Sequence, residues 1–118
     1  MIFKRVEEEH FGLIEEVTEL SEDKLQLLCD ELGIALKNLY FVCQTELTGE
    51  DKFALAKFVD TVTQEGYAEV AFNDDTDIYE YDDLRLVISL RGEDTVIFCT
   101  AKYCKKIERR LDKYKVSN

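Results

Sequence analysis

The sequence predicts an α+β protein in which N-terminal helices are followed by a small antiparallel sheet of three or four strands and by a basic C-terminal helix. Apolar residues recur at helical spacing up to Gly66 and at every second position after it, and helical spacing returns from Ala101. Because helices and strands are segregated along the chain, an α+β fold is favoured over a parallel α/β fold.

The first two helices are expected from Glu8 to Leu20 and from Ser21 to Gly33. In the first, apolar residues at helical spacing share the helix with five glutamates, which makes it acidic and amphipathic. Ser21 is a good N-cap for the second helix, and Gly33 readily ends a helix in the left-handed conformation.

A third helix is expected from Thr48 to Gly66. Thr48 is followed three residues later by Asp51, an arrangement that resembles a capping box. The segment 34–42 that precedes it is short and apolar. Its periodicity fits a buried helix or a strand, and we assign it to a helix.

Alternating apolar residues predict strands over 67–72, 84–90 and 95–100, the first of them half-buried. A turn at Arg91-Gly92-Glu93-Asp94 joins the last two strands as a hairpin. Helical spacing then returns over 101–114, with one apolar stripe made of Cys104, Ile107, Leu111 and Tyr114.

The chain has 118 residues, 26 acidic and 15 basic side chains, a net charge of −11 and 46% hydrophobic residues. This length and apolar content predict a single domain over residues 1–118 with a strongly negative surface. The sequence shows no secretory signal and no apolar run of membrane-spanning length, so we expect a cytoplasmic protein without membrane contact. The cysteines lie beside apolar residues, and we expect buried free thiols at Cys29, Cys43, Cys99 and Cys104.

Charge is distributed unevenly along the chain. Residues 1–100 carry 24 acids and 8 bases, whereas residues 101–118 carry 2 acids and 7 bases. We interpret the basic helix as docking on an acidic body, within the chain or across a homodimer. Direct nucleic-acid binding is disfavoured, because a globule with a charge of −11 repels phosphate. Proteins that bind single strands also normally place aromatic residues among their lysines and arginines. The seven bases are Lys102, Lys105, Lys106, Arg109, Arg110, Lys113 and Lys115.

Acidic residues gather in two places, on the first predicted helix and in the segment 74–83. Glutamates three or four residues apart on a helix lie close enough to repel one another. The segment 74–83 holds six acids in ten residues, and we expect a surface loop or a short edge strand there. A loop that serves solubility alone is the plainer alternative.

Several chemistries lack the residues that they need. His10, expected on the surface, is the one histidine, and no glycine-rich phosphate loop is present. The segment 73–84 matches three ligand positions of an EF-hand loop, but Ile78 replaces the required glycine and Leu84 the required glutamate. The carboxylate pairs lie on predicted surfaces without apolar surroundings. We therefore expect a non-enzymatic protein without a metal or cofactor.

The charge pattern favours an inhibitor that masks the basic nucleic-acid-binding surface of a partner enzyme, as DNA-mimic proteins of phages do against restriction or CRISPR nucleases. An immunity or antitoxin protein that neutralises a cognate toxin is one alternative, and a homodimeric regulatory subunit is another. The predicted partner-binding residues are Asp74, Asp75, Asp77, Tyr79, Glu80, Tyr81, Asp82 and Asp83, with Glu8, Glu15, Glu16 and Glu19 on the first helix.

Overall fold

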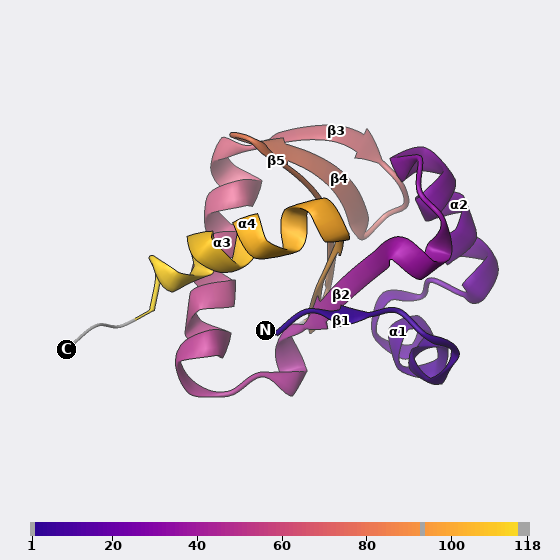
Figure 1. Cartoon of the computed structure of the whole chain (residues 1–118), viewed down its shortest axis with the longest axis horizontal. Coiled ribbons are helices and arrows are strands. Elements are labelled where there is room, and N and C mark those ends of the chain that lie inside the picture. The colour runs from indigo at the N-terminus through magenta and orange to yellow at the C-terminus, as the bar shows by residue number, and fades with distance from the viewer. Residues whose placement is uncertain (1, 93, 116–118) are drawn as a thin grey trace.

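The structure, a computed structural model, describes residues 2–92 and 94–115. Within them an antiparallel sheet of six strands separates two pairs of helices, α1 and α2 on one face and α3 and α4 on the other (Figure 1). The strand order is β1-β2-β6-β5-β4-β3. The strands are β1 (Lys4–Arg5), β2 (Leu39–Cys43), β3 (Tyr67–Ala71), β4 (Thr76–Tyr81), β5 (Leu84–Arg91) and β6 (Asp94–Thr100). The helices are α1 (Phe11–Thr18), α2 (Glu22–Leu32), α3 (Gly49–Glu65) and α4 (Ala101–Asp112).

Each face of the sheet carries its own hydrophobic core, because side chains of a strand alternate between the two faces. Along β6, Val96 and Phe98 point to the α1/α2 face, whereas Ile97 and Cys99 point to the α3/α4 face. Central strands buried on both faces read as nearly continuous apolar runs. The helices supply Ile14, Val17, Leu25 and Leu28 on one face and Leu55, Phe58, Val62, Ile107 and Leu111 on the other.

The helix ends follow the predicted signals with one exception. Ser21 caps α2, since its Oγ accepts a hydrogen bond from the Lys24 N–H at 3.4 Å, and Gly33 ends the helix at a φ of +70°. Helix α3 begins after Thr48 and ends before Gly66, as predicted, but Thr48 makes no side-chain hydrogen bond to the helix, so the capping box is not formed. Gly66 is needed sterically, because a Cβ there would meet backbone of the last helical turn at 2.5 Å.

The helix expected over 34–42 is wrong. A 3-10 turn (Leu36–Asn38) leads into β2, which pairs with β1 on one side and β6 on the other. Leu39 and Phe41 face α1 and α2 while Val42 faces α3 and α4, so both sides of the strand are buried and polar alternation is absent. With β1 and β4, this strand raises the sheet from the three or four expected strands to six.

The segment 74–83 is also not a loop or an edge strand. Most of it forms β4, which lies inside the sheet between β3 and β5. Of its six acidic residues, Asp77 and Glu80 therefore lie within β4, and the other four are divided between the turn before the strand and the turn after it, about 20 Å apart for a strand of this length. The edge strand on this side of the sheet is β3. Its edge position explains why it is mostly exposed, whereas the sequence predicted a half-buried strand.

The hairpin of β5 and β6 forms as predicted, with Arg91 opposite Asp94. Glu93 of the predicted turn lies outside the described residues. Helix α4 also forms where expected and presents Cys104, Ile107 and Leu111 to the core. The α+β class, the C-terminal helix and this hairpin are thus confirmed.

Candidate functional site: an acidic surface

The structure brings part of the first acidic set together with part of the second. Glu19 follows the last turn of α1, and Asp74 and Asp75 lie in the turn between β3 and β4. These three residues line one shallow hollow of about 180 Å³ together with Lys24 and Asn73. Carboxylates from two distant segments of the chain therefore share one surface.

Hydrogen bonds at the end of α1 place Glu19. The buried Thr18 hydroxyl donates to the Ile14 carbonyl at 2.6 Å and accepts from the Leu20 N–H at 3.1 Å. Glu19 takes a left-handed φ of 62°, and its N–H bonds the Glu15 carbonyl at 2.8 Å. These bonds end the helix and leave the Glu19 side chain 62% exposed.

The turn between β3 and β4 is fixed in a similar way. The Thr76 carbonyl accepts from the N–H groups of Phe72 at 2.9 Å and Asn73 at 3.1 Å. The Asn73 Oδ1 accepts from the Asp75 N–H at 3.0 Å, and the Asp75 carbonyl accepts from the Leu90 N–H at 2.8 Å. The turn that carries the aspartates is thereby tied to β5.

Arg91, at the end of β5, lies beside this surface. Its Nη2 is 2.8 Å from Glu19 Oε1, and its Nη1 donates to the Glu16 carbonyl at 3.1 Å. Sequence reasoning missed Arg91, because its position depends on where the β5–β6 hairpin meets α1. Lys24 and Asn73 were missed too, although an Asn after a predicted strand is a known turn signal.

We call the following six residues the acidic ridge: Glu8, Glu15, Glu16, Glu19, Asp74 and Asp75. The helix predicted from Glu8 is a 3-10 turn (Glu8–His10) that continues directly into α1. Positions 8, 12, 15, 16 and 19 are neighbours at i+3, i+4 or i+7 along this helix, and Gly12 has open space around it. Residues 7–33, which include α1 and α2, carry ten acids and one base. The ridge thus belongs largely to a strongly acidic part of the chain.

Asp82 and Asp83 lie in the turn at the other end of β4 and do not join the ridge. Arg110 of α4 contacts Asp82 at 2.9 Å and also Asp83, and the Lys106 Nζ is 3.5 Å from Asp83. Partial desolvation raises the pKa of Asp83, but a backbone hydrogen bond and the charges of Arg110 and Lys106 outweigh it and lower the pKa overall. The basic helix therefore docks on acids of its own chain, which was one interpretation of its charge.

The other predicted residues of 74–83 are also apart from the ridge. Tyr79 and Tyr81 pack against the core on the α3/α4 face and are partly buried. Burial, and then the charge of Asp77 and a hydrogen bond with it, raise the pKa of Tyr79. The Tyr81 ring lies 5.9 Å from the Arg110 guanidinium carbon. Glu80 is exposed and lies on the opposite face of β4 from Tyr79 and Tyr81, its neighbours along the strand.

His10 is not the surface residue that the sequence suggested. Its side chain is 18% exposed, and its ring packs edge-on against Phe41 with centroids 5.1 Å apart. The Nδ1 atom accepts a hydrogen bond from the Glu7 N–H at 3.1 Å. His10 thus holds the start of the acidic helix against β2.

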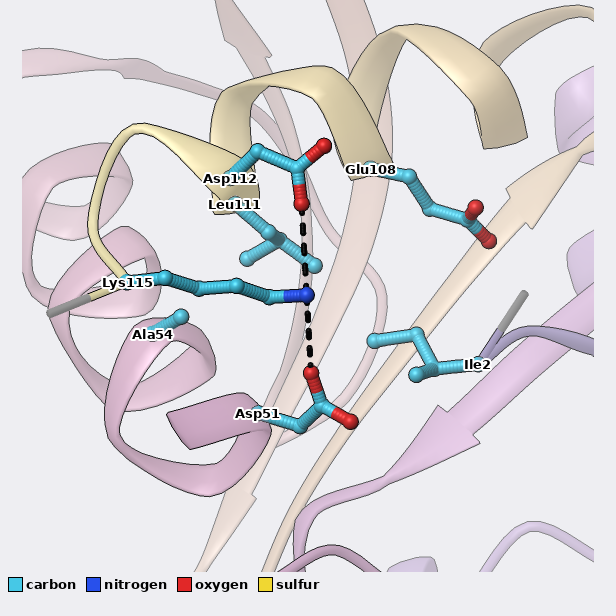
Figure 2. A pocket seen from close by; sticks show the side chains of 7 residues that line it. All are labelled: Ile2, Asp51, Ala54, Glu108, Leu111, Asp112 and Lys115. Atoms are coloured by element: carbon cyan, nitrogen blue, oxygen red, sulfur yellow. Dashed lines mark ion pairs between the residues drawn. The ribbon is translucent and has the colours of Figure 1, made fainter. Parts of the chain in front are cut away.

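A separate cavity of about 270 Å³ lies between α3 and α4 and contains several carboxylates. The Lys115 Nζ sits between Asp51 at 3.1 Å and Asp112 at 3.3 Å (Figure 2). Hydrogen bonds to Asp51 and Asp112 raise the pKa of Lys115. Glu108 lies on the Ile2 side of the cavity. Because an ammonium already occupies the space between two of the carboxylates, we interpret this cluster as a clamp between α3 and the end of α4.

The four cysteines are free and buried, as predicted. Burial, and then the charge of Asp30, raise the pKa of Cys29 to about 11, which disfavours the reactive thiolate. In the described ranges 2–92 and 94–115, no group of three histidine, cysteine or carboxylate side chains is arranged to hold a metal ion. The same ranges contain no helix with both the length and the apolar character to cross a membrane.

No family model, curated protein or solved structure matches this chain. The acidic ridge is therefore interpreted from its charge, its exposure and the elements that hold it. Glu15, Glu16 and Asp74 are exposed, and the buried Ile14 and Val17 anchor the helix that carries the two glutamates. This arrangement presents carboxylates to solvent on a supported helix and a hydrogen-bonded turn.

Proposed function

We propose that this protein is a non-enzymatic inhibitor whose acidic ridge covers the basic nucleic-acid-binding surface of a partner protein. The observation that carries the proposal is the shared surface of Glu19, Asp74 and Asp75, which joins α1 to the β3–β4 turn. Carboxylates in such a ridge can contact lysines and arginines that otherwise hold phosphates. The proposed class of protein is the DNA-mimic inhibitor that phages direct against restriction or CRISPR nucleases.

Most charges of the ridge remain available to a partner. Arg91 pairs with Glu19, whereas Glu15, Glu16 and Asp74 make no ion pair with any residue in the described part of the chain. Exposed charges attract an opposite surface over about one Debye length, roughly 8 Å at physiological ionic strength. The complex should therefore form quickly and weaken as salt is added.

The proposal is tested by capturing the partner with tagged protein from the cells in which it acts and washing with increasing salt. The ridge variant combines three exposed positions without ion pairs: Glu15→Lys, Glu16→Lys and Asp74→Lys. The matched control makes the same change of charge on exposed positions of α3: Glu50→Lys, Asp60→Lys and Glu65→Lys. Asp82 and Asp83 are unsuitable, since reversing them would break the contacts that dock α4.

The expected result is a nucleic-acid-handling protein that elutes with salt, that the ridge variant fails to capture and that the α3 control still captures. Circular dichroism should show that both variants are folded. Equal loss of the partner in both variants would contradict the proposal, because the effect would then follow net charge and not the position of the carboxylates.

An immunity or antitoxin protein is the second candidate, favoured by an exposed apolar residue on α2. Leu27 is 56% exposed and lies one helical turn from Asp23, Asp30 and Glu31. An apolar anchor within a charged rim is typical of tight protein interfaces. A complex of this kind would resist high salt, and it would be lost in Leu27→Ser but retained in the ridge variant.

A further inference from the structure

The end of α4 carries a second concentration of charge, of opposite sign, on the other face of the sheet. A hollow of about 220 Å³ is lined by Lys106, Arg109, Arg110 and Lys113 together with Asp83. Lys106 and Arg110 contact the β4–β5 turn. Arg109 and Lys113 are exposed and make no ion pair with residues 2–92 or 94–115. Docking of α4 on its own acids therefore accounts for two of these four bases.

The hollow retains a positive charge after Asp82, Asp83 and the helix dipole are counted. The four bases face the carboxylates of Asp82 and Asp83, and the C-terminal dipole of α4 adds about half a negative charge. About 1.5 positive charges remain by this count. Repulsion from the distant acids of the protein is screened beyond roughly 8 Å at physiological ionic strength. A multiply charged anion can therefore bind here although the whole chain is acidic.

A second cavity, of about 400 Å³, adjoins this hollow and shares Arg110 and Lys113 with it. Its other lining residues include Tyr81 and Tyr114. The Tyr114 hydroxyl donates to Thr61 Oγ1 at 3.1 Å, which fixes this side chain against α3. Tyrosine rings and guanidinium groups stack on nucleobases. Nucleic-acid-binding proteins place aromatic residues among their lysines and arginines. The fold brings two such aromatic residues, Tyr81 and Tyr114, beside the basic hollow.

We propose that the two adjoining cavities bind a phosphorylated nucleoside. The phosphates lie in the hollow beside Arg109 and Lys113, and the base lies against Tyr81 and Tyr114. A cavity of about 400 Å³ is within the usual range for small-ligand sites, roughly 300–1,000 Å³. A free nucleotide and a nucleotide within a single strand both present a phosphate and a base that could occupy these two cavities. The site is independent of the acidic ridge, which lies on the opposite face of the sheet.

The test is calorimetric titration of the full-length protein at physiological salt with three probes: ADP, pyrophosphate and a short single-stranded oligodeoxythymidine. The site variant is Arg109→Gln with Lys113→Gln, both outside the ion pairs of the described chain. The matched control is Lys37→Gln with Lys102→Gln, which removes the same charge from exposed positions that line neither cavity.

ADP should bind the wild type, and the site variant should weaken its binding about tenfold or more, the size expected for lost charge-assisted hydrogen bonds. The control should stay within about twofold of the wild type, since charges in exposed positions farther away are largely screened. Pyrophosphate should bind about tenfold more weakly than ADP, because it lacks the stacking base. Tighter binding of the oligonucleotide than of ADP, with the same loss in the site variant, would identify a single strand as the source of the nucleotide.

Three results would overturn the proposal. The first is absence of ADP binding at millimolar concentration in folded protein. The second is equal weakening in the site variant and the control, which would show a diffuse charge effect. The third is equal affinity for pyrophosphate and ADP, which would remove the role assigned to Tyr81 and Tyr114.

Discussion

Helices α1 and α4 cover opposite faces of the same sheet and both are amphipathic, but the chain treats their charges differently (Figure 1). On α4, the bases Lys106 and Arg110 meet the aspartates of the β4–β5 turn, and Lys115 beyond the helix meets Asp51 of α3. Directly after α1, Glu19 meets Arg91, while Glu15 and Glu16 of the helix form no ion pair in the described part of the chain.

This difference separates charges that support the fold from charges that do not. Ion pairs join α4 to the aspartates of the β4–β5 turn and so help to position the last helix. Glu15 and Glu16 instead lie about one helical turn before Glu19, and repulsion between like charges at this spacing costs a few tenths of a kcal/mol for each pair. The helix is held by its apolar side, which leaves its acidic side exposed to solvent.

The largest expected effect compares the two cores beneath these helices. Phe41 lies in the core of the α1/α2 face and Phe58 in that of the α3/α4 face, and both are fully buried. Replacing either by alanine should lower the free energy of unfolding by about 3–5 kcal/mol, because a cavity remains. Denaturant unfolding followed by circular dichroism measures both losses. A loss below about 1 kcal/mol at one site would show that the helices of that face are not tightly packed.

A smaller effect sharpens the comparison on α1. Gly12 is three or four residues from Glu8, Glu9, Glu15 and Glu16, and space around it is open. Gly12→Lys and Gly12→Glu should both gain helix propensity, but the lysine attracts these glutamates and the glutamate repels them. At low salt the lysine variant should be more stable by about 1–2 kcal/mol. Thermal unfolding at low and high salt tests this, and a difference that persists at high salt would contradict an electrostatic cause.

The smallest effect concerns the α4 side and depends on pH. Arg110→Gln removes the contacts with Asp82 and Asp83, so it should destabilise the protein slightly at neutral pH, whereas Arg109→Gln should be neutral. The pKa of Asp83 is lower in the folded protein than its usual value of 3.8. Its pairing therefore adds stability above that value, and the contribution is lost as the pH falls through the folded pKa.

Urea unfolding at neutral pH and at about pH 3 measures this linkage. The difference between wild type and Arg110→Gln should shrink at the lower pH. A difference that stays constant would mean that Arg110 stabilises the protein through packing on Tyr81 and not through its charge.

Local signals predicted most of the helices. Ser21, Gly33 and Gly66 mark helix ends by their own chemistry, and the apolar stripe of α4 is unambiguous over three turns. The strands β2 and β4 were missed for different physical reasons. Segment 39–43 is buried on both faces and lacks alternation, whereas the charges in 76–81 hid a strand whose buried positions are Thr76 and Ile78.

The candidate site could be predicted in composition but not in arrangement. Sequence indicated that Glu15, Glu19 and Asp74 belong to acidic segments, and helical spacing placed the glutamates on one helix. Which end of 74–83 meets α1 depends on the register of β4 between β3 and β5, a long-range property that local patterns do not encode. For the same reason, no sequence signal indicated that Arg110 would hold the other end.

The most direct test of the account is competition between this protein and nucleic acid for the captured partner. Increasing concentrations of the nucleic acid that the partner handles are added to the immobilised complex, and the released partner is measured. If the acidic ridge occupies a phosphate-binding surface, nucleic acid should release the partner in proportion to its own affinity. A partner that binds nucleic acid and this protein at the same time, with no change in either affinity, would contradict the account.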